Sequence, residues 1–352
     1  MAMSRRNFQA GAVVATLGAA GPFKNIVGET AMANELTGLN VPAFTLPVPT
    51  SISPQAQAFL SAAAQRIAAG PPSGDQREAA ERALQMLRPR AAAFKGTTET
   101  IDLGNGALLY RIVPEGRSGR RAEVAYFDIH GGGFTAGGGE MCRVLAMLRA
   151  QDYGVEVWSV DYRLAPQHVY PAGLDDCMAA WRAVLRHHKA QDIVAAGASA
   201  GGNLVAAMLL RARDEGLPHP SALLMLTPAV DMTGAGDSRI ANLYHDVNLY
   251  GGGGGGAQSY AGSADKTHPY LSPINGKFGK DWPPTLLSSG TRDLLLSDTV
   301  RMHRALRKAG VRAELHVTEA GGHGGFMGSA PEDHELMAEC RRFCDEAWGI
   351  AG

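Results

Sequence analysis

Hydrophobic residues in this chain gather in short runs, separated by longer stretches in which apolar and polar residues alternate with a helical period. Short apolar runs bounded by turn formers are typical of buried strands, and the longer stretches are typical of amphipathic helices. Strands are predicted at 99–103, 107–113, 123–129, 155–160, 192–196, 222–226, 285–289 and 313–317. Helices are predicted at 54–69, 75–88, 174–188, 203–213, 298–309 and 332–348. Because strands alternate with helices over most of the chain, we expect an α/β fold with a mostly parallel central sheet flanked by helices.

One segment breaks this alternation. Residues 231–273 are irregular and rich in Gly, Asn, Tyr and Asp, and they include six consecutive glycines at 251–256. We interpret the segment as an insertion that forms one part of a cap, with the glycine run as a hinge or mobile rim; a plain surface loop is the alternative. The two helices predicted before the first strand would form the other part, unless they only pack on the domain.

The N-terminus has the features of an export signal. Ser4-Arg5-Arg6-Asn7-Phe8 resembles the twin-arginine signature, a charge-free apolar run follows at 10–21, and Ala31-Met32-Ala33 offers a small-residue cleavage site. We therefore expect a signal peptide at 1–33 and a periplasmic protein, the alternative being a ragged basic end. The predicted organisation continues with cap helices at 34–95 and a catalytic domain at 96–352, interrupted by the insertion.

Composition narrows the classes of function. Of the 352 residues, 45% are hydrophobic and 19% are charged, which is typical of a folded domain with a sizeable core. The formal net charge of −1, without a basic stripe, argues against nucleic acid and against an anionic membrane surface as partner. The four cysteines have no CxxC spacing, so neither a metal site nor a disulfide scaffold is expected. The apolar run at 10–21 is too short for a stable membrane anchor, and the oligomeric state is left open, a homodimer included.

A Gly-x-Ser-x-Gly motif lies between a predicted strand and a predicted helix. In Gly197-Ala198-Ser199-Ala200-Gly201 the glycines allow a tight turn, and such a turn would expose the Ser199 hydroxyl at its apex. Alone, the pentapeptide is equally typical of an ordinary glycine-rich turn. A serine nucleophile needs a base and an acid that orients the base, and in an open α/β sheet both should follow later strands. Asp293 and His323 each follow such a strand, whereas Asp298, the competing acid, stands where it would cap the next helix.

A glycine-rich stretch after another strand supplies hydrogen-bond donors. His130-Gly131-Gly132-Gly133-Phe134 follows the predicted strand 123–129, and consecutive glycines let backbone N–H groups face a developing oxyanion, joined by the N–H of Ala200. A phosphate-binding loop is disfavoured, because the sequence has neither Gly-Lys-Ser/Thr here nor Gly-x-Gly-x-x-Gly opening a helix.

Together these motifs resemble the hormone-sensitive lipase family of bacterial esterases. The resemblance covers about 99–348 and rests on the glycine-rich motif at 130–134, the elbow, Asp293, His323, and Asp161-Tyr162-Arg163-Leu164-Ala165-Pro166 with Tyr170-Pro171-Ala172 and Asp175-Asp176. It implies an α/β-hydrolase fold, a two-part cap and hydrolysis of carboxylic esters without a cofactor or metal. By position it implies Ser199 as nucleophile, His323 as base, Asp293 as acid, and Gly132, Gly133 and Ala200 as oxyanion donors.

The sequence departs from the family pattern at three places. Ala198 stands where Asp or Thr usually precedes the serine, Asp293-Leu294-Leu295 replaces Asp-Pro-Leu, and His323-Gly324-Gly325-Phe326 carries one extra glycine. No catalytic atom is lost, but the last two changes could shift the loops of the acid and the histidine.

The expected function is a serine carboxylesterase acting on a small-molecule ester of short to medium acyl chain. The acyl pocket is expected to be lined by Phe134, Tyr244, Tyr250, Leu294 and Phe326. A lactonase or amidase with the same triad is the alternative, since these enzymes share acyl-transfer chemistry. A non-catalytic receptor on the same fold is less favoured, because the gibberellin receptor, which resembles this family, has lost the histidine that is present here as His323.

Overall fold

The computed structural model describes residues 38–70 and 76–350. The chain divides into two compact units, Met1–Thr45 and Leu46–Gly352, and the fold described below is that of the second unit. The predicted signal peptide at 1–33 lies outside the described residues, so the signal and the periplasmic location stay predictions.

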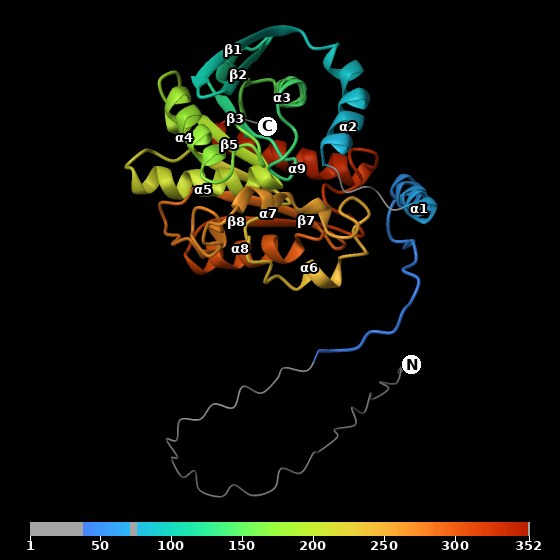
Figure 1. Cartoon of the computed structure of the whole chain (residues 1–352). Coiled ribbons are helices and arrows are strands. Elements are labelled where there is room, and N and C mark those ends of the chain that lie inside the picture. Colours follow the sequence, from blue (N-terminus) through green and yellow to red (C-terminus); the bar gives the residue numbers. More distant parts are fainter. Residues whose placement is uncertain (1–37, 71–75, 351–352) are drawn as a thin grey trace, which may run out of the picture. The chain divides into compact units, whose positions relative to one another are not determined.

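A single eight-stranded sheet forms the centre of this unit, in the order β1-β2-β4-β3-β5-β6-β7-β8 (Figure 1). β1 and β2 pair antiparallel, β2 pairs antiparallel with β4, and every later pair is parallel. The strands are β1 (Gly96–Gly104), β2 (Ala107–Pro114), β3 (Ala125–Ile129), β4 (Glu156–Asp161), β5 (Ile193–Ala198), β6 (Ala222–Leu226), β7 (Thr285–Gly290) and β8 (Ala313–Thr318). Because β3 to β8 are parallel, their carboxyl ends lie along one edge of the sheet.

Helices cover both faces of the sheet, as the alternating pattern predicts. On one face α4 (Ala172–Val184), α5 (Ala200–Asp214) and α8 (Leu296–Lys308) pack against alternate side chains of the strands. On the other face α3 (Glu140–Tyr153) and α9 (Pro331–Trp348) do the same. The alternation is visible within β3, where Phe127 belongs to the first core cluster and Tyr126 to the second. The predicted α/β fold is therefore confirmed, although α3 was not among the predicted helices.

The two N-terminal helices pack on different parts of the unit. α1 (Pro54–Ala69) is capped by Ser53, whose side chain accepts the Ala56 N–H at 3.1 Å. Leu60 of this helix joins Phe326 in a small apolar cluster. α2 (Gln76–Ala91) packs on α3, where Arg88 pairs with Glu140 at 2.8 Å. That these helices form part of a cap stays a prediction.

The insertion has a defined backbone with little regular structure. It contains α6 (Ser238–Ala241) and α7 (Gly256–Ala261), and a short 3-10 turn, Pro273–Asn275, follows it. In the glycine run, residues 251, 252, 253 and 255 have positive φ, a conformation that glycine adopts without a steric penalty. Gly256 has a φ of −60° and a different constraint, because an added Cβ would lie 2.1 Å from the carbonyl oxygen of Gly133. The glycine run thus reaches the loop of the glycine-rich motif, and its role as a hinge stays a prediction.

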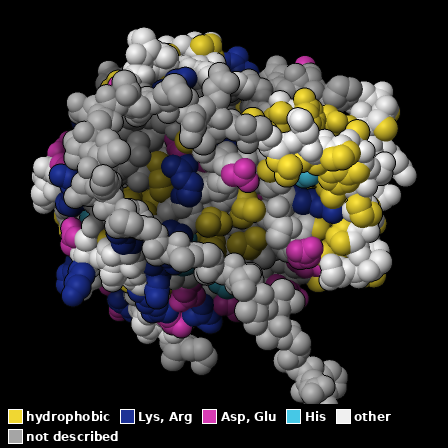
Figure 2. Space-filling model, turned by 90° about the horizontal axis from the view of Figure 1, so that it is seen from below, with side chains coloured by type: hydrophobic (Ala, Val, Ile, Leu, Met, Phe, Trp, Pro, Cys, Tyr) yellow, Lys and Arg dark blue, Asp and Glu magenta, His cyan; other side chains and the backbone are white. Residues whose placement is uncertain are grey.

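The surface carries charges of both signs. On the face seen in Figure 2, described basic and acidic side chains are interspersed, and hydrophobic side chains gather in a hollow near the centre. Among the helices of the described residues, none combines the length and the hydropathy required to cross a bilayer.

Candidate active site

The serine of the Gly-x-Ser-x-Gly motif lies at a sharp turn between β5 and α5. Ser199 has φ 55° and ψ −116°, and α5 begins at the next residue. For a residue with a side chain this backbone conformation is strained, and it raises the hydroxyl above the edge of the sheet. The turn needs glycine at position 201, because an added Cβ would lie 1.9 Å from the carbonyl oxygen of Ile129. The motif therefore forms the predicted elbow.

Asp293 and His323 meet at the same edge of the sheet. Asp293 follows β7 and His323 follows β8, and Nδ1 of the imidazole lies 3.1 Å from Oδ1 of the carboxylate. The loop with the extra glycine closes through a bridge between Gly322 and Gly325, so the added residue does not separate the histidine from the acid. Since Ser199 follows β5 of the same parallel sheet, the three residues leave one edge.

The Asp293 carboxylate is fully buried and satisfied by three donors. Besides His323, Oδ2 accepts the Ser289 hydroxyl at 2.8 Å, and Oδ1 accepts the Leu295 N–H at 2.8 Å. Burial by itself would raise the pKa of Asp293, but His323 and these hydrogen bonds outweigh it and hold the pKa below its ordinary value. The acid is therefore ionised at neutral pH and fixes the imidazole with a proton on Nδ1.

The pKa of His323 is shifted in the opposite direction to that of Asp293. Burial favours the neutral imidazole, but the charge and hydrogen bond of Asp293, with a further contribution from Asp246, raise the pKa of His323 above its ordinary value. Its side chain keeps 14% exposure, so part of the side chain remains accessible. A basic imidazole held by a carboxylate is the arrangement that activates a hydroxyl nucleophile.

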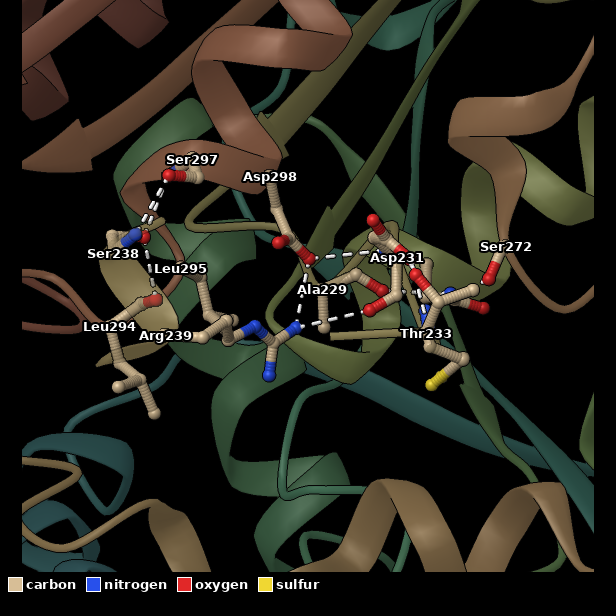
Figure 3. A network of polar contacts seen from close by, with 12 residues as sticks. Ala229, Asp231, Thr233, Ser238, Arg239, Ser272, Leu294, Leu295, Ser297 and Asp298 are labelled. Atoms are coloured by element: carbon tan, nitrogen blue, oxygen red, sulfur yellow. Dashed lines mark hydrogen bonds and ion pairs between the residues drawn. The ribbon is translucent and has the colours of Figure 1, made fainter. Parts of the chain in front are cut away.

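Asp298 does not compete for the histidine. It lies inside the first turn of α8, where its Oδ2 accepts the Asp231 N–H at 3.1 Å and pairs with Arg239 at 2.9 Å (Figure 3). The expectation that Asp298 caps the helix is wrong: α8 has Leu295 at its N-cap and no side-chain cap. The carboxylate instead binds the insertion to the body of the domain.

The glycine-rich loop after β3 lies against the elbow. An added Cβ on Gly131 would be 3.3 Å from Cβ of Ser199, which measures how closely the two turns approach. Gly132 and Gly133 have φ of 115° and 59°. Among the described residues, none accepts a hydrogen bond from the N–H groups of Gly132, Gly133 or Ala200. These donors are available to an anion that develops beside Ser199.

The motif at 161–166 supports this loop, a role that the sequence pattern did not reveal. Asp161 accepts the Gly139 N–H at 3.0 Å where α3 begins, and the Tyr162 hydroxyl donates to the His130 carbonyl at 3.1 Å. Arg163 forms a forked pair with Asp176. In the sequence, this motif is notable only for its resemblance to a family.

The residues expected to line an acyl pocket lie in different surroundings. Phe134 is 1% exposed and stacks on Tyr260 with ring centroids 4.3 Å apart, and Phe326 is buried in the small cluster with α1. Leu294 is 3% exposed beside the acid. Tyr244 is 64% exposed, and its ring packs edge-on against that of Tyr250 with ring centroids 5.4 Å apart. That these five residues line an acyl pocket stays a prediction.

In the described ranges, 38–70 and 76–350, no three His, Cys, Asp or Glu side chains are grouped so that they could hold a metal ion. The four cysteines are buried, free thiols.

Comparison with known proteins identifies the fold and the family. A family model described as alpha/beta hydrolase fold matches residues 126–327, which is more than half of the chain. Among curated proteins, an ethyl acetate hydrolase of Pseudomonas putida is 32% identical over 212 residues, covering 56% of this chain and 64% of the relative.

Solved structures match over more of the chain. The crystal structure of an esterase named E25 has 30% identity and a TM-score of 0.77, covering 88% of this chain and 98% of that one. An esterase from the bacterial hormone-sensitive lipase family has 28% identity and a TM-score of 0.69, covering 85% and 99%.

Proposed function

The chain belongs to the α/β-hydrolase fold family and, within it, to the hormone-sensitive lipase family of bacterial esterases, and from that premise we propose that it hydrolyses carboxylic esters through a Ser199-His323-Asp293 triad. The observation that carries the proposal is the pair of His323 Nδ1 with the buried Asp293 Oδ1, 3.1 Å apart, on loops that leave the same sheet edge as the strained Ser199. The unpaired N–H groups of the neighbouring glycine-rich loop support it.

In this mechanism His323 takes the proton of the Ser199 hydroxyl as the oxygen attacks the ester carbonyl. Asp293 holds the ring orientation and stabilises the imidazolium that forms. The N–H groups of Gly132, Gly133 and Ala200 stabilise the tetrahedral oxyanion, and the imidazolium then gives its proton to the leaving alcohol. Water attacks the acyl-enzyme by the same route, with His323 again as base, and releases the acid.

We further propose esters of short to medium acyl chain as substrates. The relative that is named as an ethyl acetate hydrolase supports a small acyl group. Phe134 and Leu294 are buried around the site, whereas Tyr244 is exposed, and we assign the first two to the acyl side and Tyr244 with Tyr250 to the rim. Selectivity in such sites follows pocket shape, since the acyl-transfer chemistry itself is shared.

The test is a panel of p-nitrophenyl esters from acetate to decanoate, run beside lactones and anilides, on the wild-type protein and Ser199→Ala. We expect the highest kcat/KM on esters at the short end. We expect loss of turnover in the variant by a factor of about 10⁴ or more, because only binding and the oxyanion donors would remain. Wild-type turnover by folded Ser199→Ala would overturn the assignment of the nucleophile. A preference for lactones or anilides would contradict the proposed ester substrates but would remain compatible with the proposed triad.

A further inference from the structure

A second buried carboxylate lies beside the catalytic pair, and neither the motifs nor the mechanism accounts for it. Asp246 belongs to the insertion and is fully buried. Its Oδ2 accepts the N–H of Leu294 at 2.8 Å, and its two oxygens accept the N–H of His323 at 3.1 and 3.2 Å. One side chain therefore holds the residue after the catalytic acid and the backbone of the catalytic base.

The neighbours of Asp246 strengthen the same attachment. Asn248 donates from its amide to the carbonyls of His323 at 2.9 Å and Gly325 at 3.1 Å. Asn242 donates to the carbonyl of Asp293 at 2.9 Å. We call Asn242, Asp246 and Asn248 the loop clamp. Its members come from within seven residues of the insertion, yet they bind loops that follow two different strands.

The place of Asp246 is built for a carboxylate. Oδ1 also accepts the N–H groups of Asn248 at 2.9 Å and Leu249 at 3.1 Å, so both oxygens face N–H donors. Gly322 allows the close approach, because an added Cβ there would lie 2.7 Å from Oδ1. An amide at this position would turn its NH₂ toward one set of N–H donors and leave them unpaired, which is costly in a buried site.

One departure from the family pattern creates a contact of this clamp. The family that the sequence resembles usually has proline after the catalytic aspartate, and proline has no N–H to donate. This chain has Leu294 there, and its N–H forms the shortest of the bonds to Asp246. The acid loop of this chain thus has an attachment that the usual motif could not make.

Charge acts together with geometry. The titratable and charged groups that face His323 are Asp293, Asp246 and the more distant Arg239. Burial raises the pKa of Asp246, while His323 and the N–H donors of Leu294 and His323 oppose the rise. As an anion, Asp246 stabilises the imidazolium, so it adds to the basicity that Asp293 confers on His323.

We propose that Asp246 is a positioning residue of the active site, which clamps the acid loop to the histidine loop and fixes His323 toward Ser199. The inference deepens the proposed function and rests on it. The catalytic imidazole must be held within a fraction of an ångström, and a displacement near 1 Å can cost about a hundredfold in rate. The insertion then contributes to the chemistry of the site in addition to any part it has in a cap.

The first test is Asp246→Asn, which keeps the size of the side chain and removes its charge. We expect kcat for a short ester to fall about tenfold to a hundredfold with KM little changed. We also expect the acid limb of the kcat/KM profile to move to lower pH, because the imidazolium of His323 loses a stabilising anion. NMR titration of His323 should give the same direction without depending on turnover.

Two further variants separate positioning from general stability. Asn248→Ala removes only neutral contacts to the histidine loop, so kcat should fall several-fold while the pH limb stays in place. This variant also decides the question if Asp246→Asn fails to fold. Asp298→Asn is the matched control, a buried carboxylate bound to the insertion but not to either catalytic loop. It should lower Tm, and since it reaches His323 only through its partner Arg239, it should move the pH limb less than Asp246→Asn does.

The outcomes distinguish the two proposals. Folded Asp246→Asn with wild-type kcat and an unmoved His323 titration would overturn the clamp, as would Asn248→Ala with wild-type kcat. If the wild-type protein hydrolyses no ester while the His323 titration moves in Asp246→Asn, the proposed function fails and the clamp stands.

Discussion

The proposed nucleophile and its two proposed partners occupy one edge of one sheet, but they are held there by different means. Around Ser199 the contacts are between backbones: Gly201 lies against the Ile129 carbonyl, and Gly131 lies against the elbow. Around Asp293 and His323 the contacts are hydrogen bonds from side chains, several of which come from the insertion.

This difference separates two ways of fixing a catalytic group. A turn packed backbone to backbone tolerates no added atom, so it responds to substitution by failing to form. A loop held by buried side-chain hydrogen bonds can shift by a fraction of an ångström and still fold, so its loss appears in the rate. Substitution of the glycines packed around Ser199 should therefore act through folding, and loss of the hydrogen bonds around Asp293 and His323 should act through turnover.

The largest effect is expected from Gly201→Ala. The added Cβ would overlap the Ile129 carbonyl, whose strand lies in the centre of the sheet, and we expect little soluble, folded protein. Gly104→Ala is the control, since its φ is 86° but open space surrounds it; it should cost about 1 kcal/mol and keep activity. Soluble yield, Tm and esterase activity give the answer, and a normal Tm for Gly201→Ala would contradict the tight packing.

Asp293→Asn should keep the fold and lose most of the turnover. An amide beside His323 favours the wrong tautomer, for which a loss in kcat of about 10³- to 10⁴-fold is typical. Asp298→Asn should lose far less activity and more stability, since its carboxylate pairs with Arg239 rather than with the base. Steady-state kinetics beside Tm measurements test both variants, and comparable losses of kcat would refute the assignment of the acid.

Gly256→Ala tests the contact between the glycine run at 251–256 and the glycine-rich loop after β3. Its Cβ would lie 2.1 Å from the Gly133 carbonyl and should displace that loop, lowering kcat about tenfold to a hundredfold. Gly251→Ala, at the exposed end of the run with open space around it, should keep kcat. Equal kcat in the two variants would show that the contact of the glycine run with Gly133 does not affect catalysis.

The smallest effect is a displacement of the pH profile. Because the pKa of His323 is raised and the base must be neutral, kcat/KM should increase with pH through a midpoint above 6.5, the ordinary value for histidine. Asp293→Asn should lower the midpoint of its residual activity. A wild-type midpoint at or below the ordinary value would mean that burial outweighs the carboxylates around His323.

The sequence was informative where structure is decided locally. The strand at 222–226 and the helix at 54–69 have the predicted bounds, because an apolar run and a Ser-Pro start specify them within a few residues. The elbow and the two partner loops also follow from short motifs. Helix α3 was missed, since it begins after a glycine at its N-cap without a side-chain cap and mixes Cys, Met and Ala among its buried positions.

The roles of Asp246 and Asp298 could not be predicted from the sequence, because they depend on contacts between residues that are distant along the chain. Asp246 stands in an irregular segment among Asn, Tyr and Gly, and nothing nearby separates it from an exposed turn residue. Its contact with His323 spans 77 residues of sequence. The role of Asp298 was misjudged for the same reason, because its partner Arg239 lies in the insertion. The position of Asp298 near a helix start predicts a cap, but its side chain pairs with Arg239 and does not cap the helix.

The backbone conformation of Ser199 has a consequence for how the protein can change over time. A non-glycine residue at positive φ costs about 1–3 kcal/mol, and every folded molecule carries this cost, which the proposed function assigns to turnover. Packing in the rest of the sheet must contribute enough folding free energy to compensate for this strain. Substitutions elsewhere in the core therefore reduce the same folding free energy that compensates for the strain at the elbow. Selection for activity at one residue thus restricts the drift that the whole core can accept.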